Sequence, residues 1–180
     1  MSDADLAQRA AQGDSDAYGE LVNRHAAAAR RLARTVLQNA EDADDAAQEG
    51  FLLGWRHIGR YDPARPFAPW LMRIVMNAAA DLRRKRKVRA TEEIPVSAIS
   101  PGASPEVETD RTLFRAQLED ALAQLPERQR VAVVLFDAEG YSHADIAALL
   151  GIPEGTVRSD VFHARRTLRK ALAVFKEETR

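Results

Sequence analysis

The sequence predicts an all-α fold, and three observations support this prediction. The chain of 180 residues is rich in alanine and leucine, and aromatic residues make up only 6% of it. Long stretches place apolar residues three or four positions apart, which is the spacing of one face of a helix. Runs of β-branched or aromatic residues with the two-residue alternation of a strand do not occur in it. We therefore expect helices and no sheet.

Composition narrows the classes of function. The chain has no cysteine, which excludes disulfides, thiolate zinc sites and catalysis by a thiol. The first residues, MSDADLAQRA, lack the basic segment and apolar core of a secretion signal. No apolar run approaches the ~20 residues that span a bilayer. We expect a cytoplasmic protein with no direct membrane insertion.

Charge is unevenly distributed along the chain. The formal net charge is only -1. Cations nevertheless concentrate between Arg83 and Arg89, and acids concentrate between Glu41 and Glu49. A basic patch and an acidic patch indicate two different partners.

Residues 91–111 are predicted to form a flexible linker between two small helical domains, residues 1–90 and residues 112–180. The linker segment contains three prolines and several serines and threonines, but no apolar period. Each flanking domain has the apolar periodicity of four helices.

The first domain is expected to contain helices over residues 3–12, about 15–37, 42–58, and from about 66 onward. Ser15 or Asp16 can cap the second helix. The third helix has an apolar face with Phe51, Trp55 and Ile58. Another face of the same helix carries the polar residues Asp45, Gln48 and Glu49.

The fourth helix is predicted to carry two contrasting faces. Pro66 suits its first turn. Its apolar stripe consists of Phe67, Leu71, Ile74, Ala78 and Leu82. The other face carries Arg73, Asn77, Asp81 and Arg84.

Asn77 and the cations that follow it suit nucleic acid. An amide can read a base edge while the run from Arg83 to Arg89 attracts phosphates. Tyr61, Phe67 and Trp70 flank the start of the same helix, and exposed aromatic rings beside cations stack on unpaired bases. Both features have an ordinary alternative, which is a solvated helix end for the cations and core packing for the rings.

The second domain is expected to contain helices over residues 113–125, 126–136, 142–150 and 154–175. The first of these carries apolar residues at helical spacing, namely Phe114, Leu118, Leu122 and Leu125. Ser142 and Asp145 resemble a capping box at the start of the third, and Gly151 ends it.

The last two helices have the proportions of a helix-turn-helix, with Ile146, Leu150, Val157 and Val161 as its small core. The outward face of the second helix carries Glu154, Arg158, Ser159, Phe162, Arg165, Arg166 and Arg169. Arginine forks suit both guanine edges and phosphates, so we expect this helix to lie in the major groove of DNA. The alternative is an amphipathic helix with a solvated basic face.

The acidic cluster from Glu41 to Glu49 has more than one interpretation. Carboxylates are natural ligands of Mg²⁺, so a metal-dependent nuclease is one possibility. The same acids suit a helix start and a solvated or partner-binding face, which we prefer. The four histidines have no ligand spacing, and the sequence contains no Gly-rich phosphate loop. We expect no metal, no other cofactor and no enzymatic activity.

Three stretches together resemble the extracytoplasmic-function (ECF) group of the sigma-70 family. The stretch DADDAAQEGFLLGWRHIGRYD resembles the family's regions 2.1 to 2.2, and FAPWLMRIVMNAAADLRRKRK resembles regions 2.3 to 2.4. The stretch LAQLPERQRVAVVLFDAEGYSHADIAALLGIPEGTVRSDVFHARRTLRKAL resembles region 4. Their order and spacing match the family over nearly the whole chain except the linker.

The resemblance implies a sigma2-like four-helix domain, a sigma4-like helix-turn-helix domain, and a function without catalysis. Such a protein carries core RNA polymerase to promoters, recognises their minus 10 and minus 35 elements, and helps to open the duplex. Asp45, Gln48 and Glu49 would dock on the clamp helices of the polymerase β′ subunit. The linker would thread toward the RNA exit path. An anti-sigma factor would hold the protein inactive.

By the same resemblance, two groups of residues would bind promoter DNA. The minus 10 group is Tyr61, Trp70, Arg73, Asn77, Asp81, Arg84, Lys85 and Arg86. The loop over residues 59–66 would help to hold a flipped base of the melted non-template strand. The minus 35 group, which would bind duplex DNA, is Glu154, Thr156, Arg158, Ser159, Phe162, Arg165 and Arg166.

Asp160 and His163 depart from the family's pattern, because they stand where basic residues are usual. An acid near phosphates weakens DNA binding, although Asp160 can pair with a neighbouring arginine. We expect His163 to make minus 35 binding mildly pH-dependent, which an affinity that is flat between about pH 6 and pH 8 would exclude.

Two other functions are weighed against the sigma factor. One is a helix-turn-helix transcription regulator that does not bind core polymerase, and the acidic third helix argues against it because a plain repressor does not need such a helix. The other is the nuclease, which predicts Mg²⁺-dependent cleavage that is lost when Asp45 is changed. We prefer the sigma factor.

Overall fold

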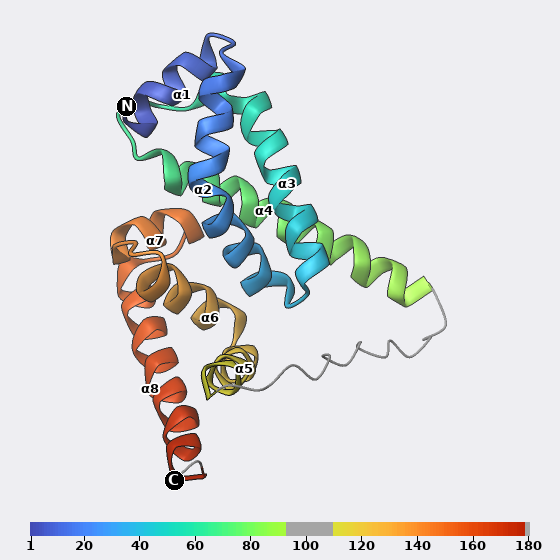
Figure 1. Ribbon diagram of the computed structural model, residues 1–180, viewed down its shortest axis with the longest axis vertical. Helices are drawn as coiled ribbons and strands as arrows, with labels where there is room; N and C mark the ends of the chain where they lie inside the picture. Colours follow the sequence, from blue (N-terminus) through green and yellow to red (C-terminus); the bar gives the residue numbers. More distant parts are fainter. Residues whose placement is uncertain (93–109, 179–180) are drawn as a thin grey trace.

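The computed structural model describes residues 1–92 and 110–178, and within them the chain is helical (Figure 1). The N-terminal half consists of α1 (Asp3–Ala11), α2 (Ser15–Leu37), α3 (Ala40–His57), the 3-10 turn η1 (Ile58–Arg60) and α4 (Phe67–Glu92). The C-terminal half consists of α5 (Asp110–Ala123), α6 (Glu127–Val133), the π-helical turn η2 (Val134–Ala138), α7 (His143–Leu150) and α8 (Glu154–Glu178). The described residues contain no strand, so the all-α prediction is confirmed. None of the helices among them is both long and apolar enough to cross a membrane.

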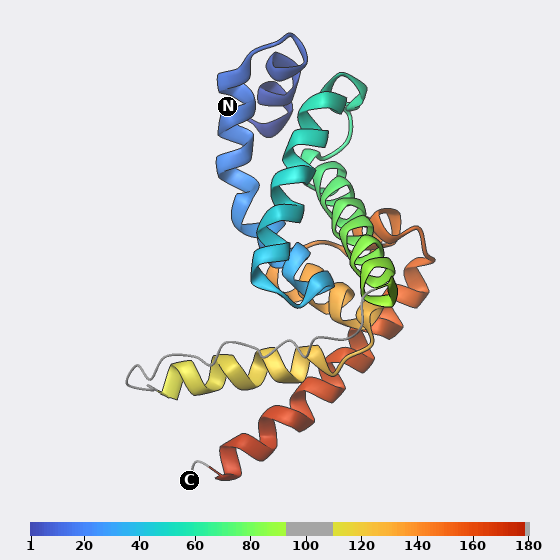
Figure 2. The same ribbon diagram turned by 90° about the vertical axis from the view of Figure 1, so that its right-hand side faces the viewer.

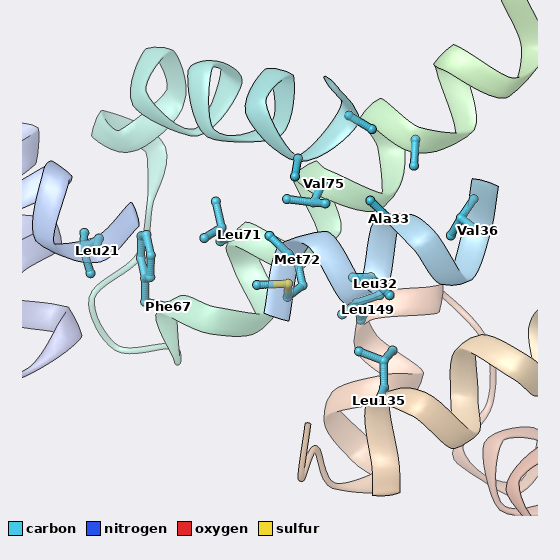
Figure 3. Packing of buried hydrophobic residues seen from close by; sticks show 14 of the residues in the cluster. Leu21, Leu32, Ala33, Val36, Phe67, Leu71, Met72, Val75, Leu135 and Leu149 are labelled. Carbon is cyan, nitrogen blue, oxygen red and sulfur yellow. The ribbon is translucent and has the colours of Figure 1, made fainter. Parts of the chain in front are cut away.

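Helices α2, α3 and α4 pack around a common apolar core, and α1 lies against α2 (Figure 1). Leu21 and Leu32 of α2 and Leu71, Met72 and Val75 of α4 are completely buried there (Figure 3). Burial of such side chains is the main favourable term that holds the helices together.

The cap of α2 differs from the prediction. Asp14, rather than Ser15 or Asp16, caps the helix, and its Oδ1 accepts a hydrogen bond of 3.0 Å from the Ala17 N–H. Ser15 and Asp16 already belong to the first helical turn. A capping side chain must come from the residue before that turn, because its backbone is not yet helical.

Most of the predicted linker, residues 91–111, lies outside the described residues. Helix α4 extends to Glu92 and α5 begins at Asp110, so both ends of that segment are helical. Phe114 of α5 was expected on an apolar face, but its side chain is exposed. The small apolar cluster of this region consists of Leu125, Val133 and Ala164, and α5 contributes Leu122 to it.

The predicted capping box and turn of the helix-turn-helix are confirmed. The Asp145 N–H donates to Ser142 Oγ at 3.1 Å, and the Ser142 N–H donates to Asp145 Oδ2 at 3.3 Å. Gly151 ends α7 with a positive φ of 67°, a conformation that glycine adopts without steric cost.

The helix-turn-helix core differs from the prediction in one residue. Ile146, Val157 and Val161 are buried as expected, whereas Leu149 is more deeply buried than Leu150. The single helix expected over residues 126–136 is also modified, because α6 passes into the π-helical turn η2 after Val133.

The two halves of the chain share one apolar core. Leu32 and Val36 of α2 belong to the same buried cluster as Leu135 of η2 and Leu149 of α7, and Figure 3 shows Leu32, Leu135 and Leu149 meeting there. In a second view, α5 and the end of α8 extend away from this shared core (Figure 2). The positions of both halves are therefore linked by packing.

Candidate functional site

An acidic face lies on the outside of α3. Asp45, Gln48 and Glu49 are all exposed, and their spacing of three and four residues places them on one side of the helix. Their neighbours Ala46, Ala47 and Gly50 are buried. The apolar side of α3 therefore anchors the helix and leaves these three side chains available to a partner.

Two other acids of the same stretch have structural contacts. Asp42 is buried and pairs with Arg86 of α4. Asp44 lies 3.4 Å from the Nε atom of Arg30 on α2. Among the described residues, no three His, Asp or Glu side chains come together as a metal-ion site would require. These acids thus pair with cations of neighbouring helices.

A groove of about 550 Å³ lies between α2 and α3, beside the acidic face. Phe51, Leu52 and Trp55 contribute much of its lining, and Gln48 of the acidic face also borders it. The Tyr18 hydroxyl donates to the Phe51 carbonyl at 2.5 Å, and burial raises the pKa of this hydroxyl. The groove presents apolar surface next to acids, which suits a helix of a partner protein.

The polar face predicted for α4 is exposed along its length. Arg73, Asn77, Asp81 and Arg84 are all accessible and follow one another at intervals of three or four residues. The opposite side buries Leu71, Met72, Val75, Ala78 and Ala79. The arrangement brings an amide and cations together on one exposed surface.

Several cations of α4 already have protein partners. Arg84 pairs with Asp81 on the same helix. Arg86 pairs with the buried Asp42 of α3. Arg83 pairs with Glu127 of α6, in the C-terminal half of the chain. Lys85 is exposed.

The aromatic residues near the start of α4 form one cluster. The Tyr61 ring lies 5.3 Å from the Phe67 ring and 5.4 Å from the Trp70 ring, measured between centroids. Tyr61 and Phe67 are buried, while Trp70 is partly accessible. The structure thus corrects the expectation of an exposed Tyr61 ring. Its hydroxyl donates to the Arg65 carbonyl at 2.5 Å and so ties down the loop over residues 59–66.

The outward face predicted for α8 is exposed as a set, comprising Glu154, Arg158, Ser159, Phe162, Arg165 and Arg166. The Phe162 side chain is 63% exposed, which is unusual for a large apolar residue. Arg158 contacts Glu154 at 2.6 Å along the helix. Thr156 is only partly accessible. The face combines arginine forks, which suit guanine edges, with an apolar ring, which suits a thymine methyl group.

The two unusual residues of α8 lie on different sides. Asp160 is buried and accepts a hydrogen bond of 2.6 Å from Arg128 Nε of α6. His163 is exposed, with its ring 5.5 Å from that of Phe162. The acid therefore lies away from the exposed face of α8, and its arginine partner comes from another helix.

The prediction from sequence missed the residues that border this face from other elements. Phe136 of η2 stacks on His143 of α7 with ring centroids 4.3 Å apart. The guanidinium of Arg165 lies 5.0 Å from the Phe136 ring centroid and also binds Asp137, with its Nε 2.9 Å from Oδ2. Phe136 and Asp137 both belong to the π-helical turn η2, which packs next to α8 here. Such a turn has no signal in local periodicity.

The chain resembles two described families in separate segments. The model of sigma-70 region 2 matches residues 21–89, and the model of sigma-70 region 4 matches residues 115–168. A curated relative, the ECF RNA polymerase sigma factor SigM of Mycobacterium tuberculosis (strain ATCC 25618 / H37Rv), is 40% identical over 173 residues. That alignment covers 95% of this chain and 85% of SigM.

Solved structures show the same fold. CnrH in complex with the cytosolic domain of CnrY matches with a TM-score of 0.73 and 30% identity, over 96% of this chain and 97% of that one. The sigma factor RpoE in complex with the anti-sigma factor NepR, from Bartonella quintana, matches with a TM-score of 0.71. That alignment covers 87% of this chain and 97% of RpoE, and its 24% identity supports a likeness of fold.

Proposed function

Since the chain belongs to the ECF sigma factors of the sigma-70 family, we propose that it directs core RNA polymerase to specific promoters and assists their opening. The observation that carries this proposal is the presence, on one chain, of an exposed acidic face on α3 and exposed cationic faces on α4 and α8. Faces of opposite charge attract different partners, so the chain can hold polymerase and DNA together. The polymerase performs the chemistry, and the protein acts in the cytoplasm.

The acidic face is the proposed contact with polymerase. Asp45, Gln48 and Glu49 would dock on the clamp helices of the β′ subunit. Their exposure supports this role, as does the groove beside them with Phe51, Leu52 and Trp55 in its lining. Charge at the rim of such an interface steers association, while the apolar groove supplies buried area.

The face of α4 is the proposed reader of the minus 10 element. Arg73, Asn77, Asp81 and Arg84 form its exposed row, and Trp70 offers an accessible edge for an unpaired base. Lys85 and Arg86 would grip phosphates, and Arg86 must share its charge with Asp42. Tyr61 would act indirectly, because its hydroxyl holds the loop that receives the flipped base.

The face of α8 is the proposed reader of the minus 35 element in duplex DNA. Arg158, Ser159, Phe162, Arg165 and Arg166 project outward from the second helix of the helix-turn-helix. Glu154 orients Arg158 through their ion pair, and Thr156 stands at the first turn of the same helix. Residues from the first turns of such a helix reach the base edges in the major groove.

We propose a region 2 domain at residues 1–90, a linker at residues 91–111 and a region 4 domain at residues 112–180. The matched segments, 21–89 and 115–168, lie inside the two proposed domains. An anti-sigma factor is a further proposed partner, because the similar proteins CnrH and RpoE were solved with CnrY and with an anti-sigma factor.

Promoter-specific transcription with purified core polymerase tests this function. We expect the wild-type chain to direct initiation on a subset of a promoter library. Asp45→Arg should abolish binding to core, whereas Arg158→Ala should reduce only the dependence on the minus 35 sequence. Asp16→Arg is the matched control, because it reverses an exposed acid of α2 outside the three faces. A wild-type chain that binds DNA but never associates with core would instead be a plain helix-turn-helix regulator.

A further inference from the structure

The contact between Asp160 and Arg128 joins the proposed recognition helix to α6. Asp160 stands between the exposed Ser159 and the buried Val161, and its own side chain is only 5% exposed. Two hydrogen bonds link it to Arg128, from Nε to Oδ2 at 2.6 Å and from Nη2 to Oδ1 at 3.3 Å. The bond to Asp160 also raises the pKa of Arg128.

This contact restrains the rotation of α8 about its own axis, which apolar packing alone does not. Val157, Val161 and Ala164 are buried on the inner face of α8, but apolar contacts of this kind define the rotation of a helix only loosely. A forked guanidinium that binds both oxygens of a carboxylate fixes an angle as well as a distance. Because successive residues of a helix are rotated by about 100°, a small rotation of α8 would move its whole outward face together.

We propose that Arg128 and Asp160 form a positioning pair, which sets the rotation of α8 on α6 and thereby the specificity for the minus 35 element without contacting DNA. The proposal rests on the proposed function of α8. The pair is asymmetric, since Asp160 is inside the protein and Arg128 is largely exposed. Removal of Arg128 therefore leaves a buried carboxylate without its partner, and α8 must move to bring that carboxylate to water.

Binding specificity of the holoenzyme tests the positioning pair. The probes are a minus 35 duplex, selected from a random library by the wild-type holoenzyme, and a scrambled duplex. Arg128→Gln should lower the ratio of specific to non-specific affinity about five- to tenfold, in the lower range of one lost base contact. The double change of Arg128→Asp with Asp160→Arg should restore most of that ratio.

The salt dependence of DNA affinity distinguishes a positioning role from a direct contact with phosphate. Arg158→Ala, the comparison variant, should flatten the plot of log affinity against log salt by about 0.9 if Arg158 touches a phosphate. Arg128→Gln should leave this slope unchanged. Equal losses of affinity for both duplexes, with a flatter salt slope, would make Arg128 a phosphate contact and overturn the proposal. An unchanged ratio of specific to non-specific affinity would overturn it as well.

A single variant, Arg128→Lys, tests the proposal even if the double variant does not fold. Arg128→Lys keeps the charge but loses the fork, so we expect it to lower the specificity ratio, although less than Arg128→Gln does. Full specificity with lysine would show that charge alone matters and would contradict the positioning role. A selection that enriches no sequence at all would contradict the proposed function of α8 instead.

Discussion

Two glycines determine how closely α3 approaches its neighbours. A Cβ atom at Gly50 would lie 2.7 Å from Val75 Cγ2 and 3.0 Å from Val75 Cα. A Cβ atom at Gly54 would lie 2.6 Å from the Tyr18 hydroxyl. Close packing leaves no room for these atoms, so the glycines keep α3 against α4 and α2. The exposed acids of α3 depend on that placement.

Gly50→Ala should therefore destabilise the protein. We expect a loss of about 1–3 kcal/mol in the free energy of unfolding, since the added methyl group meets the Val75 backbone and α4 must shift. Gly19→Ala is the matched control, because nothing lies within 4 Å of its added atom and alanine favours a helix. Urea unfolding measures both, and equal stability of the two variants would contradict the close approach.

Helix α7 depends on its cap because it has only 8 residues. A helix this short is not stable alone, so its terminal hydrogen bonds and its packing must hold it. Ser142 and Asp145 satisfy backbone donors at its start, and the Ser142 hydroxyl also donates to Asp145 Oδ2 at 2.6 Å. The position of α7 in turn supports α8, which packs against it.

Ser142→Ala should cost about 1 kcal/mol of unfolding free energy, the typical effect of losing a capping side chain. Ser142→Thr retains a hydroxyl and should cost much less. Urea unfolding followed by far-UV circular dichroism makes the comparison. Identical stability of the alanine and threonine variants would show that the capping box contributes nothing.

The cap of α2 predicts a pH dependence. The bond from the Ala17 N–H, followed by the bond from Arg9, lowers the pKa of Asp14 below its ordinary value of 3.8. A carboxyl whose pKa is lowered by folding stabilises the folded state above its ordinary pKa, and this contribution disappears as the pH falls through the lowered value. Asp14→Asn should therefore be less stable than wild type at neutral pH.

Acid unfolding distinguishes the charge of Asp14 from its capping shape. Asparagine is also a good cap, so the Asn variant removes the charge and keeps an acceptor. We expect the difference in urea midpoint between wild type and Asp14→Asn to shrink as the pH is lowered below about 3.8. A difference that stays constant from neutral pH to acid would contradict a contribution from the ionised carboxylate.

The shared core makes the two halves one packed body. Leu32 of α2 is completely buried in a cluster that also contains Leu135 and Leu149. An ion pair between the halves adds to this packing, because Arg31 Nε lies 2.6 Å from Glu139, whose side chain is only 8% exposed.

Leu32→Ala should destabilise both halves together. We expect a loss of about 2–5 kcal/mol, typical of a leucine truncated in a core. Protection of amide hydrogens from exchange should fall in α7 as well as in α3. Leu52→Ala is the control, since its side chain is 48% exposed. Loss of protection in the N-terminal half alone would show that the halves do not share a core.

Much of this architecture follows from local patterns in the sequence. Apolar spacing predicted the helices, and Ser142 with Gly151 predicted both ends of α7. The exposed rows that begin at Asp45, at Arg73 and at Arg158 were also expected, because the burial of one helix face leaves the opposite face to solvent. These features depend on residues within a few positions of one another.

The remaining features required contacts between distant residues. Asp42 and Asp160 turn inward because Arg86 and Arg128 approach them from other helices. Tyr61 is buried by the packing of its loop on Phe67 and Trp70. Arg31 and Glu139 are 108 positions apart, and no local pattern indicates that they meet. Periodicity shows which face of a helix is apolar, whereas only packing in three dimensions selects the helix that covers it and the charges that pair.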